Sequence, residues 1–210
     1  MYELPAPGVT TVHEWEVKRS RFITLIRRAR SETEAREFIA EVRGQYPDAR
    51  HHCSAYLLHV DGANPVERSS DDGEPAGTAG KPMLDMLRGS GMLDIAAVVV
   101  RYFGGIKLGA GGLVHAYSNS VGDALPGVSR VTRSRRELYA VEFPHSEAGR
   151  WEADLRARGV DVTDVEYGQV VTYTLATAPG KLAELESQLA AVTSGRVMPV
   201  EAGSAWVESR

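Results

Sequence analysis

A largely apolar stretch at residues 93–103 constrains the fold more than any other feature of the chain. Six apolar residues follow one another at its centre, from Ile95 to Val100. A strand with one face in water alternates apolar and polar side chains, so an unbroken run is typical of a strand buried on both faces. The run is far shorter than the roughly 20 apolar residues of a membrane helix. The sequence therefore predicts a buried strand within a globular protein.

Further elements are indicated around this strand. Ser31 and Glu34 have the spacing of a capping box, and apolar residues follow at helical spacing, which predicts a helix over residues 31–45. We also expect one or two strands within residues 9–30, a strand over 52–60, a long loop over 61–81, a short helix over 82–88, a helix over 113–125 and a long strand over 131–143.

The last third of the chain has a β-α-β-β-α-β order. The long strand is followed by a helix over residues 146–158, strands over 160–167 and 170–176, a helix over 181–192 and a closing strand over 195–200. This order is that of the ferredoxin-like split βαβ unit. The fold class is therefore predicted as α+β, with two domains at residues 1–136 and 137–210.

Composition favours a cytoplasmic protein. The chain is 43% hydrophobic and 25% charged, as in ordinary globular proteins, and its start has neither the basic nor the apolar stretch of a secretory signal. The single cysteine, Cys53, excludes an intramolecular disulfide and suits a reducing compartment. Its apolar neighbours predict a buried strand position. We expect no membrane association, and no pattern indicates an oligomeric state.

Charge is unevenly distributed along the chain. Residues 1–143 hold 18 Lys and Arg against 18 Asp and Glu, and the remainder holds 6 against 10, which accounts for the net charge of −4. Within the neutral part, basic residues cluster around residues 18–30 and again at 130–136. Such clusters form either a positive face for a nucleic acid or charged strand edges that block edge-to-edge pairing.

The first of two glycine-rich segments spans residues 69–82. Three carboxylates stand beside a Gly-x-x-Gly-Lys turn that opens a helix, whose N-terminus suits a phosphate or carboxylate. The carboxylates either hold a divalent cation or cap the turns. The turn is not a Walker A loop, because Pro82 follows its lysine where Ser or Thr would bind the metal. This segment is the strongest single candidate for function, with ligand contacts expected from Asp71, Asp72, Gly73, Glu74, Gly77, Thr78, Gly80 and Lys81.

The second glycine-rich segment, residues 101–112, follows the buried strand and leads into a helix. It lacks the Gly-x-Gly-x-x-Gly spacing of a dinucleotide loop, and no acidic residue stands about 20 positions further on at the end of a second strand. Cations, an aromatic ring and bare backbone together suit a nucleic-acid contact. Tight packing and left-handed turns explain the glycines equally well. The candidate ligand-binding residues here are Arg101, Tyr102, Gly104, Gly105, Lys107, Gly111 and Gly112.

No catalytic constellation is indicated elsewhere. His51 and Cys53 share one face of a strand while His52 points to the other, and the remaining histidines lack the spacing of a zinc site. Ser118 and Ser120 have no base signalled near them, and no Gly-x-Ser-x-Gly elbow occurs. We therefore predict no catalytic residue, no metal ligand and no cofactor.

Several motifs follow one another in a fixed order along residues 18–114. They are Lys18-Arg-Ser-Arg-Phe22, Tyr46-Pro-Asp-Ala-Arg-His51, His51-His-Cys53, SDDGEPAGTAGKPML at residues 70–84 and VVVRYFGGIKLGAGGLV at residues 98–114. Together they resemble the YigZ/IMPACT family, most strongly over residues 12–128. The resemblance implies an N-terminal domain of the ribosomal protein S5 domain 2-like kind and a ferredoxin-like second domain. That pairing is similar to the last two domains of the translocase elongation factor of the ribosome.

The resemblance also implies contact with RNA, the ribosome or a translation factor. Eukaryotic members regulate translation initiation by competing for a kinase activator, with help from an N-terminal RWD domain that we do not expect in this chain. We expect a non-catalytic translation-linked regulator in which Lys18, Arg19 and Arg21, with Arg101 and Lys107, contact phosphates. Two alternatives stay open: a metal-assisted enzyme acting on a phosphorylated or peptide-like small molecule, and a protein-interaction module acting through the acidic C-terminal domain.

Overall fold

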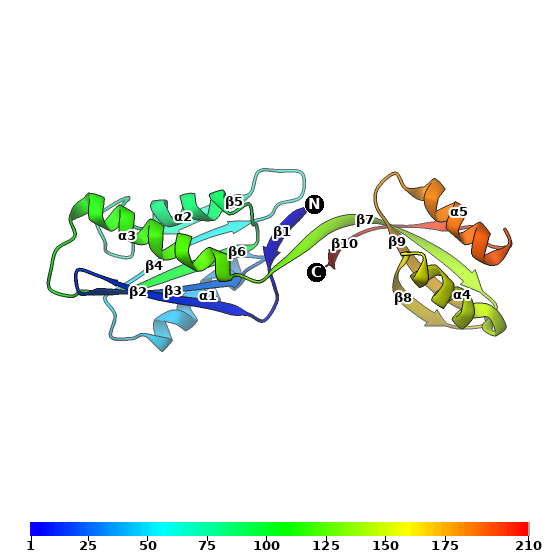
Figure 1. Cartoon of the computed structure of the whole chain (residues 1–210), viewed down its shortest axis with the longest axis horizontal. Coiled ribbons are helices and arrows are strands. Elements are labelled where there is room, and N and C mark those ends of the chain that lie inside the picture. Colours follow the sequence, from blue (N-terminus) through cyan, green and yellow to red (C-terminus); the bar gives the residue numbers. More distant parts are fainter. Residues whose placement is uncertain (210) are drawn as a thin grey trace. The chain divides into compact units, whose positions relative to one another are not determined.

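The computed structural model describes residues 1–209, which form two compact units, Tyr2–Thr132 and Arg133–Ser209 (Figure 1). The first unit contains β1 (Tyr2–Pro5), β2 (Thr10–Val17), β3 (Ser20–Arg28), α1 (Glu32–Gln45), β4 (His51–Leu58), β5 (Val66–Ser70), α2 (Gly80–Gly89), β6 (Ile95–Tyr102), α3 (Gly109–Ala124) and a 3-10 turn (Leu125–Gly127). The chain continues through β7 (Arg130–Phe143) into α4 (His145–Ala157), β8 (Asp161–Tyr167), β9 (Val171–Thr177), α5 (Leu182–Thr193) and β10 (Val200–Ser209). The predicted two-domain α+β architecture is confirmed.

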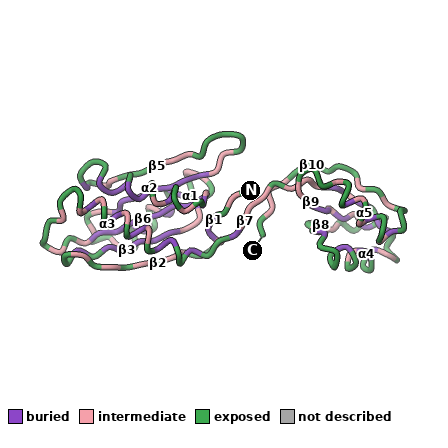
Figure 2. Tube along the Cα trace, turned by 45° about the horizontal axis from the view of Figure 1, so that its top comes forward, coloured by how far each residue is buried: buried purple, intermediate pink, exposed green. Residues whose placement is uncertain are grey.

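The first domain is built on a five-stranded sheet of order β2-β3-β6-β4-β5, whose neighbouring strands are antiparallel. β6, the strand expected from the apolar run, is at its centre. Ile95, Ala97 and Val99 belong to the core beneath α2 and α3, and the residues between them belong to the core beneath α1. Figure 1 shows α2 and α3 side by side on one face of the sheet and α1 on the other, and Figure 2 colours the buried residues of this domain purple. Burial of β6 on both faces is thereby confirmed.

Local capping explains how α1 begins. Ser31 has an extended backbone, and its hydroxyl accepts a hydrogen bond from the Glu34 N–H over 3.1 Å. The Glu34 carboxylate accepts in turn from the Arg30 N–H over 2.8 Å. The predicted cap thus satisfies one N–H of the first turn, and the Glu34 side chain reaches back to Arg30, one residue before the cap position.

Several expected element bounds in the first domain are wrong. The long loop over residues 61–81 contains β5, a polar edge strand that pairs with β4. Its residues are partly or fully exposed on both faces, so no apolar alternation signalled it. α2 begins two residues before Pro82, and α3 begins four residues before the expected Leu113, inside the second glycine-rich segment. Glycine is a poor helix former, so local propensity hid the first turn of α3.

The second domain has the expected β-α-β-β-α-β order, with β10 and β9 on either side of β7 and β8 beyond β9. Its core contains the ring of Trp151, which meets Phe143 edge-on at 5.0 Å between centroids. The closing strand begins at Val200, so the expected strand over 195–200 is wrong, and most of that stretch is irregular. No helix within residues 1–209 is long and apolar enough to span a membrane.

Candidate ligand-binding site

One end of the first-domain sheet brings together segments that lie far apart in the sequence. β3 and β4 begin there and β6 ends there, because Arg101 lies opposite Phe22 and His51 in the strand registers. The β2–β3 hairpin and the β6–α3 loop also lie at this end, on the left of Figure 1. We call it the basic end, defined by Lys18, Arg19, Arg50, Arg101 and Lys107.

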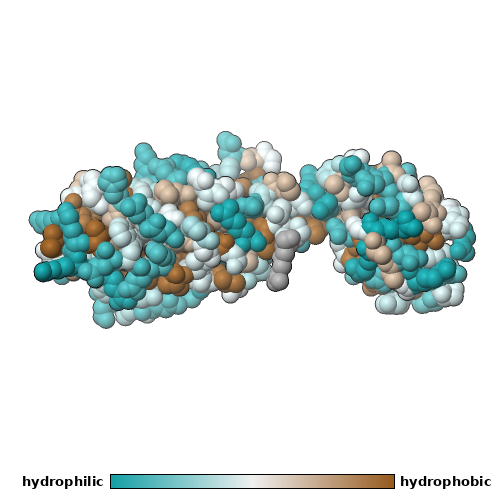
Figure 3. Space-filling model, in the orientation of Figure 1, coloured by the Kyte–Doolittle hydropathy of each residue, from teal (hydrophilic) through white to brown (hydrophobic). Residues whose placement is uncertain are grey.

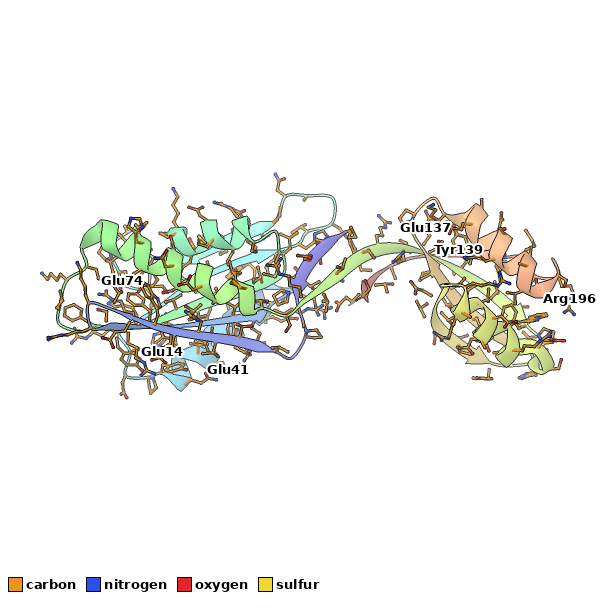
Figure 4. All side chains as sticks on the ribbon, viewed as in Figure 1. Glu14, Glu41, Glu74, Glu137, Tyr139 and Arg196 are labelled. Atoms are coloured by element: carbon orange, nitrogen blue, oxygen red, sulfur yellow. The ribbon has the colours of Figure 1, made fainter. Side chains whose placement is uncertain are left out.

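A buried ion pair joins the two glycine-rich segments at this end. Arg101 Nη1 donates to Glu74 Oε1 over 2.6 Å, and the two side chains are only 6% and 4% exposed. The Tyr117 hydroxyl donates to the same oxygen over 2.8 Å. Burial, reinforced by Cys53 and Glu74, raises the pKa of Tyr117, so this phenol stays a donor. Figure 4 shows Glu74 near the start of α3.

The buried pair leaves polar atoms unused. Both hydrogen bonds to Glu74 end on Oε1, and Oε2 accepts none from the residues that the structure describes. Arg101 Nε is buried with no hydrogen-bond partner. The Arg101 guanidinium lies 5.5 and 5.6 Å from the ring centroids of Phe22 and Phe103. Arg101 Nε is one of several such buried nitrogens within residues 1–209, so the feature that distinguishes this pair is the pocket beside it.

Glu74 and Arg101 line a pocket of about 380 Å³. Pro75, Phe103 and Leu108 supply apolar wall, while Arg50, His51 and Lys107 supply polar groups. Phe103 is 49% exposed. In Figure 3 this end of the first domain shows hydrophobic atoms among hydrophilic ones. Pockets that bind small molecules commonly combine apolar walls with a few convergent polar groups.

The N-terminus of α3 opens onto this pocket. Gly109 and Ala110 line it, and Leu108 at the cap position provides no side-chain hydrogen bond to the first N–H groups. No acidic residue occupies the first turn. A 16-residue helix with an uncapped start leaves N–H donors and the positive end of the helix dipole available to an anion.

The corresponding site at α2 is already filled by the protein itself. Asp71 Oδ2 accepts from the Gly77 N–H over 2.7 Å, and Oδ1 accepts from the N–H groups of Ala79 and Gly80 over 3.0 and 2.8 Å. Burial opposes ionisation of Asp71, but these three donors outweigh it and lower its pKa. Of the two roles left open for this carboxylate, the geometry matches capping.

Asp72 ties the same loop to β4. Its carboxylate accepts from the His52 N–H over 2.6 Å and from the Arg43 guanidinium, and its carbonyl oxygen lies 2.9 Å from His51 Nδ1. Burial opposes ionisation, but the His52 N–H and Arg43 lower the pKa of Asp72 overall. Asp71, Asp72 and Glu74 thus have three separate sets of partners. Within residues 1–209 no three His, Cys, Asp or Glu side chains gather as a metal site would require.

Two glycines are required by close approach of the protein's own backbone. A Cβ at Gly104 would lie 1.9 Å from the carbonyl oxygen of Arg19, and one at Gly80 would lie 2.7 Å from the Ser70 nitrogen. No L side chain fits at such distances. At both positions the glycine is explained by tight packing, which was the structural alternative for these segments.

Four of the five cations of the basic end form no ion pair within residues 1–209, whereas Arg101 and most other arginines of the first domain do. Lys18 and Arg19 are exposed at the tip of the β2–β3 hairpin and make no ion pair in the described chain, nor do Arg50 and Lys107. Arg21, expected to contact a phosphate, pairs instead with Glu14. The arginines paired with carboxylates elsewhere are Arg27, Arg36, Arg43, Arg68, Arg88 and Arg130.

The remaining candidate residues are distributed around the site. The Thr78 hydroxyl donates to the Pro75 carbonyl, and Lys81 is exposed in the first turn of α2. Tyr102 lies under the Arg21 guanidinium at 5.8 Å. Cys53 is buried as expected, and burial raises its pKa to about 12, so it is an inert thiol. The glycines are placed in turns at Gly73, Gly77 and Gly105 and in the first turn of α3 at Gly111 and Gly112.

Sequence reasoning missed part of the pocket. Arg50 and His51 enter it from the start of β4, and Phe103, Leu108 and Ala110 enter it from the β6–α3 loop and α3. The motif at residues 46–51 contained the first two, but no local pattern marked them as ligand-facing. Had the start of α3 been placed at Gly109, its uncapped N-terminus would have been recognised as a candidate anion site.

Known proteins resemble the chain over both units. The Impact N-terminal domain matches residues 18–125, and a domain of unknown function, DUF1949, matches residues 141–196. The IMPACT family member YigZ of Escherichia coli (strain K12) is 40% identical over 91% of this chain and 93% of its own length.

Two further relatives agree. The IMPACT family member YvyE of Bacillus subtilis (strain 168) is 40% identical over 77% of this chain and 73% of its own. A crystal structure of a hypothetical protein is 37% identical, with a TM-score of 0.61 over 95% of this chain and 97% of its own. With these motifs, domains and relatives together, the chain belongs to the IMPACT family.

Proposed function

We propose that this chain is a translation-linked regulator that binds RNA through the basic end of its first domain. The observation that carries the proposal is the contrast in ion pairing. Lys18, Arg19, Arg50 and Lys107 have no carboxylate partner within the described residues, whereas most other arginines of the domain do. Unpaired cations beside an exposed aromatic ring suit phosphates and stacked bases. The link to translation comes from the family resemblance.

The β2–β3 hairpin supports this role. Lys18 and Arg19 both have positive φ, at 47° and 63°, which a two-residue hairpin turn usually assigns to Asn and Gly. Each side chain in this conformation costs about 1 kcal/mol. Strain of this kind is kept at sites where the side chains serve a function, here the presentation of two cations at the tip.

A double variant, Lys18→Asn with Arg19→Gly, tests the proposal. It removes both charges but supplies the residues that the turn prefers, so stability rises by about 1 kcal/mol while RNA affinity falls. Fluorescence anisotropy with single-stranded RNA measures affinity between 50 and 200 mM salt. Four phosphate contacts predict a slope of about −2.8 in log affinity against log salt, and the variant lowers its magnitude by about 1.4.

Arg36→Gln with Arg88→Gln is the matched control, because it removes two positive charges that are paired elsewhere on the domain. The control keeps the wild-type slope. Sedimentation of the full chain with ribosomes at low and high salt tests the link to translation. Binding that ignores salt, or no binding to RNA and ribosomes, contradicts the proposal.

A further inference from the structure

The pocket at the basic end is built to take more than a bare backbone phosphate. Its floor holds the Glu74–Arg101 pair, with Glu74 Oε2 free of hydrogen bonds from residues 1–209 and Arg101 Nε without a partner. A buried carboxylate that lines a pocket and has one oxygen unused can accept hydrogen bonds from a ligand that carries N–H or O–H donors.

The start of α3 lines the same pocket and carries groups that suit an anion. Gly109 and Ala110 begin α3 without a side-chain cap, and Lys107 lies two residues before Gly109. Arg50 adds a second cation that forms no ion pair among the described residues. Helix N-terminus and cations together favour a doubly charged phosphate monoester over a neutral group.

The pocket also has an apolar lining. Phe103 is about half exposed, and Leu108 and Pro75 lie beside it. An aromatic ring in this position suits a flat ring system, because base–aromatic stacking contributes about 1–3 kcal/mol per base. A ligand that matches all three kinds of lining carries a phosphate, a flat ring and hydrogen-bond donors for Glu74.

We propose that this pocket binds one nucleotide that carries a phosphate monoester, with its phosphate at the start of α3 and an amino-bearing base edge toward Glu74. The volume of about 380 Å³ is of the size that small-ligand sites have. Two sources share this chemistry: a free mononucleotide and the phosphorylated end of an RNA strand. The inference deepens the proposed function and rests on it only for the RNA source.

Calorimetric titration of the full chain with AMP, GMP and CMP, and with the matching nucleosides, is the direct test. The nucleotides bind at least about tenfold more tightly than the nucleosides, because the phosphate supplies the contact with α3 and the cations. Uridine monophosphate binds more weakly than AMP, GMP or CMP, since uracil has no exocyclic amino group to donate to Glu74. Equal affinities for nucleotides and nucleosides, or no binding of either, overturn the inference.

Ala110→Asp places a carboxylate at the exposed second residue of α3, where it stabilises the helix and repels a phosphate. It weakens nucleotide binding by about tenfold without unfolding the protein. Ala183→Asp is the matched control, because Ala183 is the exposed second residue of α5. It leaves nucleotide affinity unchanged. Equal effects of the two variants overturn the placement of the phosphate.

RNA strands of one sequence, with phosphate or hydroxyl ends, distinguish the two sources. Tighter binding of the phosphorylated strand, lost in Ala110→Asp, assigns the RNA end to the pocket. Mononucleotide binding with indifference to strand ends assigns the free nucleotide. RNA binding that depends on Lys18 and Arg19 without any nucleotide binding overturns this inference and leaves the proposed function standing. Nucleotide binding without RNA binding supports this inference and overturns the proposed function.

Discussion

The two glycine-rich segments look alike in the sequence but use their polar groups in opposite ways. In residues 69–82, Asp71 caps the start of α2 and Asp72 holds β4 and Arg43, so most charged groups are satisfied internally. In residues 101–112, Lys107 forms no ion pair in the described chain and α3 starts without a cap. Glycines mark a turn before a helix in both segments. A nearby carboxylate decides whether the first N–H groups of that helix are capped, which we call a closed start, or left available, which we call an open start.

The Glu74–Arg101 pair connects the two segments, and breaking it gives the largest expected effect. Arg101→Met leaves the Glu74 carboxylate buried without its counterion, so the free energy of unfolding falls by about 3–5 kcal/mol in urea denaturation. Arg21→Met, which breaks the exposed pair with Glu14, costs less than about 1 kcal/mol. A loss below about 1 kcal/mol for Arg101→Met would show that the pair does not hold the segments together.

Removing the cap of the closed segment is expected to have the next largest effect. Asp71→Ala loses three charge-assisted hydrogen bonds at a partly exposed site, which lowers the free energy of unfolding by about 2 kcal/mol at pH 7. The folded-state pKa of Asp71 is lowered, so its contribution is present above about pH 4 and is lost as pH falls through the folded pKa.

The measurement is urea denaturation of wild type and Asp71→Ala between pH 7 and pH 3. The difference between the two proteins narrows toward low pH, where the Asp71 carboxylate of the wild type is protonated. A gap that stays constant across this range argues that the aspartate acts through packing rather than through charge.

The smallest effect is expected for Lys107 and Lys81, which are directly comparable because each belongs to a glycine-rich segment that opens a helix. Lys107→Ala changes the free energy of unfolding by less than about 0.5 kcal/mol, since the side chain makes no ion pair in residues 1–209. RNA affinity at 0.1 M salt falls about fivefold through loss of one phosphate contact. Lys81→Ala, in the closed segment, alters neither quantity. Equal loss of RNA affinity in both variants would erase the distinction between the segments.

Much of the fold was predictable because its signals are local. The apolar run that became β6, the capping box of Ser31 and Glu34, and the β-α-β-β-α-β order of the second domain each depend on neighbouring residues. The edge strand β5 and the first turn of α3 were not predictable in this way. β5 is polar and partly exposed on both faces, and α3 begins with glycines that only packing holds in a helix.

The buried strand, the two-domain order and the two glycine-rich helix starts follow from local sequence patterns. Which helix start is capped depends on tertiary contacts, because Asp71 accepts from the Gly80 N–H nine positions further along the chain. Tertiary contacts also bring Glu74 and Arg101 together over 27 positions and add Arg50 from β4. Strand registers set these distances, and a register depends on the packing of the whole sheet rather than on any one segment.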